Sequence, residues 1–197
     1  MLKTIDPFRF VHLIKAKRLG SAIVPYLKSD KSILDVGCGN MQIASYIQHI
    51  YPEKKIIGVD IRDYRTTDLP IILYDGKKLP FTNKQFDCAY VVFVLHHTDN
   101  PQEMFREIIR VTKKIVIIEE VYNSKFQKIV TFLHDWVFNK LESVFMEVPG
   151  NFLTDREWKS TFDSFGMILQ DEQDVWQMPK PLNLTHQKLY ALSSRRK

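Results

Sequence analysis

The sequence predicts an α/β protein with a Rossmann-like open, mainly parallel sheet and helices on both faces. Short apolar stretches alternate with segments of helical periodicity, an order that favours parallel strands joined by crossover helices. The first of these stretches, 32–36, leads directly into Gly37-Cys38-Gly39, where the chain can turn sharply and leave bare backbone for a ligand. Ligands of such sheets bind outside the carboxyl ends of the strands. We therefore expect the functional site at this turn.

Composition sets broad limits on size and partners. A chain of 197 residues with 45% hydrophobic and 26% charged residues is expected to form one domain with a substantial core. The net charge of +5 permits an anionic partner, but a solvated basic surface is the simpler explanation. Cys38 and Cys88 have neither zinc nor redox spacing, which predicts buried thiols in a cytoplasmic protein. We expect no signal peptide and no transmembrane segment.

The first expected element is a helix over residues 7–28. Its apolar positions recur at helical spacing, with interruptions near Gly20 and Pro25. Basic residues among them leave open a peripheral contact with a membrane surface. A cap helix that packs on the body of the domain is the favoured interpretation.

Strands and helices then alternate along the chain. Strands are expected at 32–36, 55–60, 71–74, 86–95 and 115–120, with helices at 41–50 and 101–111. Asn40 is a candidate cap for the first of these helices, and Asn100-Pro101 starts the second, with Pro101 well placed in its first turn. The aromatic-rich stretch 122–145 predicts a helical insertion.

The end of the chain predicts one more helix and an antiparallel hairpin. Thr154 and Glu157 have capping-box spacing, and Gly166 can end the helix that they begin. Candidate closing strands follow at 167–175 and 186–192, with Pro181 and Asn183 in the turn between them.

Acidic residues stand at the ends of the expected strands. Asp60 ends the second strand, where a carboxylate can accept both hydroxyls of a ribose. Asp75-Gly76 follows the third strand, where it can pair with a base amino group, and 93–97 ends the fourth. This pattern describes a nucleoside-containing ligand. A dinucleotide fingerprint would need a third glycine where the chain has Gln42, and no Lys-Ser/Thr pair marks a phosphate loop.

Several motifs in this order resemble those of class I S-adenosylmethionine-dependent methyltransferases of the small-molecule type. The matching segments are 33–39, 58–60, 75–81, 86–97 and 106–111. The likeness spans about residues 31 to 120, and the helix that begins at Thr154 resembles a late helix of the same family. It implies one domain, 1–197, made of a cap helix (1–30), a cofactor-binding core (31–120), a helical insertion that forms a lid on the acceptor side (121–153) and closing elements (154–197).

The resemblance implies S-adenosylmethionine as the cofactor and S-adenosylhomocysteine as its product. Asp35 would contact the methionine amino group, directly or through water. Backbone at Gly37, Gly39 and Phe93 would approach the methionine part. Many family members have a glycine where this chain has Met41, whose side chain is expected to narrow the pocket.

The resemblance also assigns the nucleoside end of the cofactor. Asp60 would hold the ribose hydroxyls and Ile61 would pack on the adenine ring. Asp75 and Gly76 would lie at the adenine amino group.

We expect no metal in this site. His96-His97 is a tempting metal pair or general base, but consecutive residues of a strand point to opposite faces and cannot both face one ion. One histidine is therefore expected to be packed or hydrogen-bonded and the other to line the crevice. His97 is the candidate substrate-facing residue.

The acceptor is expected to be a small organic molecule, aromatic or lipid-like, methylated on oxygen, nitrogen or carbon. Trp136, with Phe126, Phe132 and Phe145 of the insertion, could line its pocket, although packing on the sheet is the commoner explanation of helical spacing. Nucleic acid is a second acceptor class, for which the chain carries no appended RNA-binding module. A non-catalytic scaffold and an NAD-linked enzyme remain as alternatives. The sequence does not define an oligomeric state.

Overall fold

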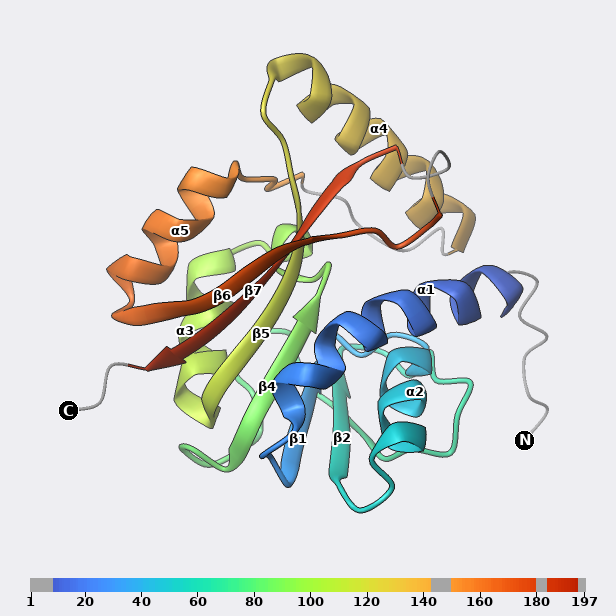
Figure 1. Cartoon of the computed structure of the whole chain (residues 1–197), viewed down its shortest axis with the longest axis vertical. Helices are drawn as coiled ribbons and strands as arrows, with labels where there is room; N and C mark the ends of the chain where they lie inside the picture. Colours follow the sequence, from blue (N-terminus) through green and yellow to red (C-terminus); the bar gives the residue numbers. More distant parts are fainter. Residues whose placement is uncertain (1–8, 143–149, 180–183, 195–197) are drawn as a thin grey trace.

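A single sheet of seven strands runs through the molecule (Figure 1). The computed structural model describes residues 9–142, 150–179 and 184–194. In spatial order the strands are β3 (Ile71–Leu73), β2 (Lys55–Asp60), β1 (Ser32–Val36), β4 (Phe86–Val92), β5 (Thr112–Val121), β7 (His186–Ser194) and β6 (Met167–Val175). The first five are parallel, and β7 is antiparallel to both β5 and β6. The predicted α/β fold is confirmed.

Helices cover both faces of the sheet (Figure 1). They are α1 (Arg9–Ile23), α2 (Gln42–Ile50), α3 (Pro101–Val111), α4 (Lys125–Glu142) and α5 (Asp155–Ser164), with short 3₁₀ helices η1 (Val24–Leu27) and η2 (Leu95–His97). One core cluster joins α1 and α2 to Ile33 and Cys88, and the other joins α3 and α5 to Leu34 and Ala89. Consecutive strand residues thus point to opposite faces and are buried on each.

The register aligns the carboxyl ends of the central strands. Val36 pairs with Val59 of β2 and with Val91 of β4. The residues that follow these strands, including Gly37 and Asp60, therefore meet at one edge of the sheet.

The N-terminal helix packs on the body of the domain, as predicted. Leu19 and Ile23 are buried in the cluster that α1 shares with α2. A Cβ at Gly20 would lie 2.5 Å from Cδ1 of Tyr46, so this glycine allows the two helices to approach closely. Pro25 falls in η1, after the α-helix has ended. Among the described residues, no helix is long and apolar enough to cross a membrane.

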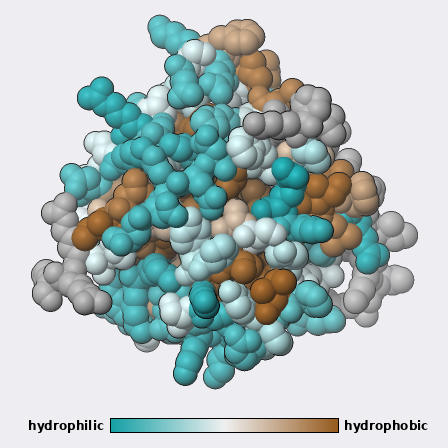
Figure 2. Space-filling model, viewed as in Figure 1, coloured by the Kyte–Doolittle hydropathy of each residue, from teal (hydrophilic) through white to brown (hydrophobic). Residues whose placement is uncertain are grey.

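The predicted insertion forms α4, which lies beyond the carboxyl edge of the sheet (Figure 1). Of the two interpretations of its aromatic residues, packing on the sheet is wrong for Phe126 and Trp136, which are 76% and 46% exposed. Figure 2 shows apolar surface over α4 and over the start of α1. Phe145 lies outside the described residues.

The closing elements follow their local sequence signals. Thr154 and Glu157 form the capping box of α5, and Gly166 follows the helix with a φ of +69°. The strands β6 and β7 then pair antiparallel, as predicted. Their expected turn residues, Pro181 and Asn183, lie outside the described residues.

Candidate active site

A cleft of about 780 Å³ opens at the carboxyl edge of the sheet. Seven of the residues predicted to bind the cofactor line it, namely Gly37, Gly39, Asp60, Ile61, Asp75, Gly76 and Phe93. His97 lines it as well, whereas Asp35 and Trp136 do not. Side chains from outside the predicted motifs complete the wall: Lys15 of α1, Glu120 of β5, His134 and Asp135 of α4, and Gln177.

The glycine turn after β1 is shaped by backbone conformation and by lack of space. Gly37 and Gly39 have φ values of +64° and +50°, which residues with a Cβ rarely adopt. The N–H of Gly37 donates to the carbonyl of Val59 at 2.8 Å. A Cβ at Gly37 would lie 2.5 Å from Cγ2 of Val94, so both conformation and packing require glycine there.

Asp60 is fixed at the wall of the cleft by backbone donors. Its Oδ2 accepts from the N–H of Gly39 at 2.8 Å, and its Oδ1 accepts from the N–H of Ile61 at 2.7 Å. Burial raises the pKa of this carboxyl group, and the backbone hydrogen bonds partly oppose the shift. A carboxylate can accept about four hydrogen bonds, so acceptor capacity remains for a ligand.

Ile61 and the Asp75 loop form the other side of this end of the cleft. Ile61 is 58% exposed, although it is apolar and lies in a cleft. Asp75 accepts from the N–H groups of Lys77 and Lys78 at 2.9 and 3.3 Å, and these bonds lower its pKa. Its carboxylate is therefore held in a turn at the mouth of the cleft.

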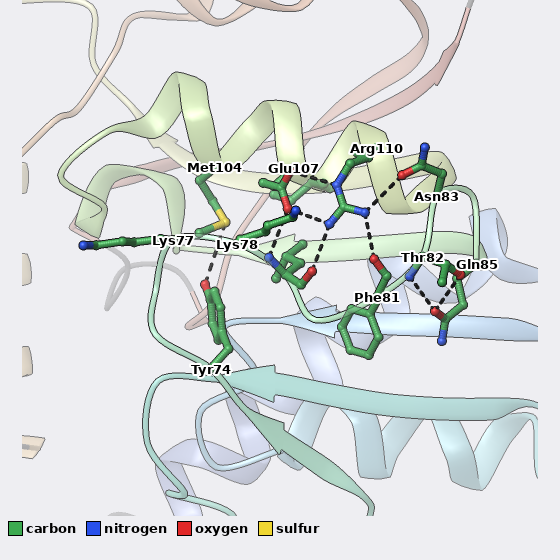
Figure 3. A network of polar contacts seen from close by, with 12 residues as sticks. Tyr74, Lys77, Lys78, Phe81, Thr82, Asn83, Gln85, Met104, Glu107 and Arg110 are labelled. Carbon is green, nitrogen blue, oxygen red and sulfur yellow. Dashed lines mark hydrogen bonds and ion pairs between the residues drawn. The ribbon is translucent and has the colours of Figure 1, made fainter.

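The segment after Asp75 is anchored to α3 by Arg110 (Figure 3). The Arg110 guanidinium donates to the carbonyls of Leu79 and Phe81 at 2.9 and 2.7 Å. Glu107 accepts from Arg110 and from the N–H of Leu79, which closes the network. This anchor links the position of the segment after Asp75 to α3.

Met41 does not narrow the cleft, contrary to expectation. Its backbone adopts a φ of +59°, and its side chain is buried in the core. A Cβ at Gly58 would lie 2.7 Å from the Met41 methyl group, which places this side chain over β2. Met41, rather than Asn40, is the cap residue of α2, and Asn40 accepts from the N–H of Gln42 at 3.1 Å.

Asp35 lies inside the sheet rather than at the cleft wall. It pairs with Gly58 of β2 and Tyr90 of β4, and it is only 4% exposed. Burial raises its pKa to about 7, while Tyr90 works to lower it. A contact between Asp35 and a ligand would therefore need an intermediary or a local rearrangement.

The histidine pair corrects a sequence prediction. The strand β4 ends at Val92 rather than Leu95, because Phe93 adopts a φ of +56° and the chain turns into η2. The alternation of a strand therefore does not apply to His96 and His97. Their Nε2 atoms lie 3.8 and 3.7 Å from Oδ1 of Asp135, so both face one carboxylate. The prediction that one histidine is packed and the other lines the cleft is confirmed.

Two acids at the end of β5 support this part of the cleft. Glu119 accepts from the N–H groups of Val94 and Leu95 at 3.1 and 2.8 Å, and its second oxygen contacts Nδ1 of His96 at 2.5 Å. Glu120 accepts from the Thr185 hydroxyl at 2.6 Å, and burial raises its pKa to about 7. Sequence reasoning missed both acids, although two carboxylates that end an apolar strand were an available signal.

Comparisons with known proteins agree with this architecture. Residues 34–118 match the family model described as a methyltransferase domain. The malonyl-[acyl-carrier protein] O-methyltransferase of Legionella pneumophila is 28% identical over 109 residues, which cover 48% of this chain and 38% of the relative. The ubiquinone/menaquinone biosynthesis C-methyltransferase UbiE of Pseudomonas putida is 24% identical over 145 residues, which cover 65% of this chain and 54% of the relative. The tRNA U34 carboxymethyltransferase of Campylobacter curvus is 29% identical over 98 residues, which cover 44% of this chain and 33% of the relative.

The chain thus spans about half the length, or less, of these curated relatives. Solved structures resemble it over most of its length. A SAM-dependent methyltransferase from Aquifex aeolicus has a TM-score of 0.63 at 15% identity and covers 95% of this chain and 94% of its own. The plantazolicin methyltransferase BpumL, solved with SAH, has a TM-score of 0.65 at 15% identity, and the match covers 97% of this chain and 87% of BpumL. Residues 34–118 thus match a methyltransferase domain, and the fold of the chain is the one seen in solved SAM-dependent methyltransferases.

Proposed function

We propose that this protein binds S-adenosylmethionine in the cleft and transfers its methyl group to a small organic acceptor. The observation that carries the proposal is the meeting of Gly39, Asp60, Ile61 and Asp75 from three separate strand ends in one cleft. When bound, S-adenosylmethionine supplies a methyl group that is already activated on a sulfonium. The cleft offers a carboxylate, Asp60, for the ribose hydroxyls of this molecule and an apolar side chain, Ile61, for its adenine ring.

The nucleoside would occupy the end of the cleft near β2 and β3. The Asp60 carboxylate, held by the N–H groups of Gly39 and Ile61, offers acceptor capacity for the two ribose hydroxyls. The exposed side chain of Ile61 would be covered by a planar base, and burial of this apolar surface favours binding. Asp75 and Gly76 would lie at the edge of that base.

The methionine end would lie over the glycine turn and Phe93. Among the described residues, and apart from its own chain neighbours, nothing lies within 4 Å of a Cβ built at Gly39, so the backbone there is open to close approach. The Asp35 carboxyl group, buried in β1 just before the turn, would contact the amino group of the ligand only through an intermediary or after a local rearrangement. These residues bind and orient, and positioning with exclusion of water can supply much of the rate of a displacement reaction.

The acceptor would enter between α1 and α4, with α4 serving as a lid. The side chains that these helices present to the cleft are Lys15, His134 and Asp135, next to His97. The exposed aromatic residues of α4, including Trp136, do not line the cleft, so an aromatic or lipid-like acceptor would meet them only outside it. The malonyl-[acyl-carrier protein] O-methyltransferase and the C-methyltransferase of ubiquinone/menaquinone biosynthesis support a small organic acceptor, and the tRNA U34 carboxymethyltransferase supports RNA as the alternative. The buried free thiols of Cys38 and Cys88 support a reducing compartment, the cytoplasm.

Calorimetry with S-adenosylmethionine, S-adenosylhomocysteine and NAD tests the cofactor. We expect the first two to bind with one site per chain and NAD not to bind. Asp60→Ala should abolish or strongly weaken binding while the protein still melts cooperatively. Binding of NAD alone, or no binding of the methionine derivatives, would overturn the proposal in favour of an oxidoreductase or a scaffold. With the cofactor established, tritium transfer to small-molecule extracts or to bulk tRNA separates the two acceptor classes.

A further inference from the structure

Three side chains of types that can bind a metal ion meet beside the cleft, and two of them, His97 and Asp135, line it. The nitrogen and oxygen atoms that His96, His97 and Asp135 can offer to an ion all lie within 4.8 Å of one another. Oδ1 of Asp135 is 3.8 Å from Nε2 of His96 and 3.7 Å from Nε2 of His97. A zinc ion with bonds of about 2.0–2.2 Å holds neighbouring ligand atoms roughly 3–3.5 Å apart. Small side-chain adjustments would therefore bring these three groups to one ion.

The orientation of His96 is fixed by a carboxylate behind it. Nδ1 of His96 contacts Oε2 of the fully buried Glu119, whose other oxygen accepts two backbone N–H groups. The Phe152 ring stacks on the imidazole with a centroid distance of 4.7 Å. This leaves Nε2 directed toward Asp135, where it is buried and makes no hydrogen bond to the described part of the chain. A histidine that binds a metal through one nitrogen commonly donates from the other to a carboxylate in this way.

Charge also favours a cation here. Asp135 and the buried Glu119 and Glu120 place three carboxylates around the two histidines. A divalent ion would offset part of this negative charge and would also satisfy the buried Nε2 atom of His96.

We propose that His96, His97 and Asp135 bind one divalent transition-metal ion, with Zn²⁺ as the first candidate. Two histidines and one carboxylate are the protein ligands of several catalytic zinc sites, which keep a fourth position open. Because His97 and Asp135 line the cleft, the open position faces the same space as Gly37 and Phe93. An acceptor with a phenol, enol or other ionisable hydroxyl could coordinate there and become more acidic. This choice of acceptor rests on the proposed function, whereas metal binding does not.

Titration of the metal-free full chain with Zn²⁺ tests the proposal. After dialysis against a chelator, we expect calorimetry and elemental analysis to give one ion per chain. The absorption spectrum of the Co²⁺ form should show the intense bands of a low-coordinate site with nitrogen ligands. Glu119→Gln should weaken binding roughly 10- to 100-fold, the range for loss of an outer carboxylate partner. Asp135→Asn and His97→Gln should weaken it further, since they remove ligands.

A matched variant guards against adventitious binding and misfolding. His49→Gln alters an exposed histidine on α2 that does not line the cleft. It should bind Zn²⁺ as the unmodified chain does, and every variant should melt cooperatively. Absence of binding, or binding that persists unchanged in folded Asp135→Asn and His97→Gln, would overturn the metal site. Titration of the same metal-free protein with S-adenosylmethionine separates the two proposals, because cofactor binding without zinc binding refutes the metal site alone.

Discussion

The backbone N–H of Gly39 donates to Oδ2 of Asp60 over 2.8 Å and joins the turn after β1 to the acid that ends β2. The N–H of Ile61 holds the other carboxylate oxygen at 2.7 Å. The carboxylate is therefore oriented by its own backbone before any ligand arrives. This preorganisation lowers the entropic cost of binding a pair of hydroxyls.

Asp60→Asn should weaken the binding of S-adenosylmethionine at least about tenfold, because a hydrogen bond to a charged group contributes about 1.5–3 kcal/mol. The amide would also place a donor against one of the two backbone N–H groups. Calorimetry measures the change. Asp63→Asn, in the same loop but not in the cleft wall, is the matched control and should bind normally. Equal affinities for the two variants would contradict this role of Asp60.

Gly37→Ala should destabilise the fold by about 1–3 kcal/mol, the usual cost of a residue in a strained backbone conformation, with a further cost from the contact with Val94. Gly166→Ala shares the positive φ but has open space around it, so it should cost less. Urea unfolding of both variants measures the difference. Adding Val94→Ala to Gly37→Ala should recover only the part of the lost stability that comes from the contact with Val94. If the double variant loses as much free energy of unfolding as the two single variants lose together, the predicted clash is excluded.

Met41→Gly should destabilise the protein by about 1–3 kcal/mol and leave the affinity for S-adenosylmethionine unchanged. Glycine relieves the positive φ but leaves a cavity where the buried side chain packed, and the cavity has the larger effect. Unfolding and calorimetry on the same sample measure both quantities. Tighter cofactor binding by this variant would show that the side chain does narrow the cleft.

Asp35 should make stability fall as pH rises between about 4 and 7. Its pKa in the folded protein is about 7, above the ordinary value of 3.8, so the unfolded chain loses this proton first. The stability that the neutral carboxyl provides is complete below pH 4 and is lost by about pH 7. Asp35→Asn should remove this decline in urea unfolding curves. Glu120 titrates in the same range in both proteins, so parallel pH profiles would contradict the assignment to Asp35.

Arg110→Lys should loosen the loop that carries Asp75 and lower stability by about 1 kcal/mol. A lysine cannot reproduce the planar fork that reaches two carbonyls and Glu107 at once (Figure 3). Hydrogen exchange at the Leu79 amide, which donates to Glu107, reports on the loop. Arg106→Lys, at an exposed position of the same helix, is the control and should leave this amide protected. Unchanged protection in Arg110→Lys would show that the loop is held by other contacts.

The sequence by itself determined the sheet, the glycine turn and the acids that end its strands. These features depend on residues that are close along the chain. Apolar runs such as 32–36 form strands that are buried on both faces, and Gly37, Gly39 and Asp60 follow where the strands end. The parallel register then brings the strand ends to one edge, as the crossover order predicts.

Only the tertiary structure decided what lies opposite that edge. A positive φ at Phe93 ends β4 early, so that His96 and His97 face one carboxylate instead of opposite sides of a strand. That carboxylate, Asp135, comes from α4, while Glu119 belongs to β5. Local periodicity does not predict these contacts between distant residues. The distances between their side chains are set by the packing of elements that lie far apart in the chain. The same packing turns Met41 into the core and away from the cleft.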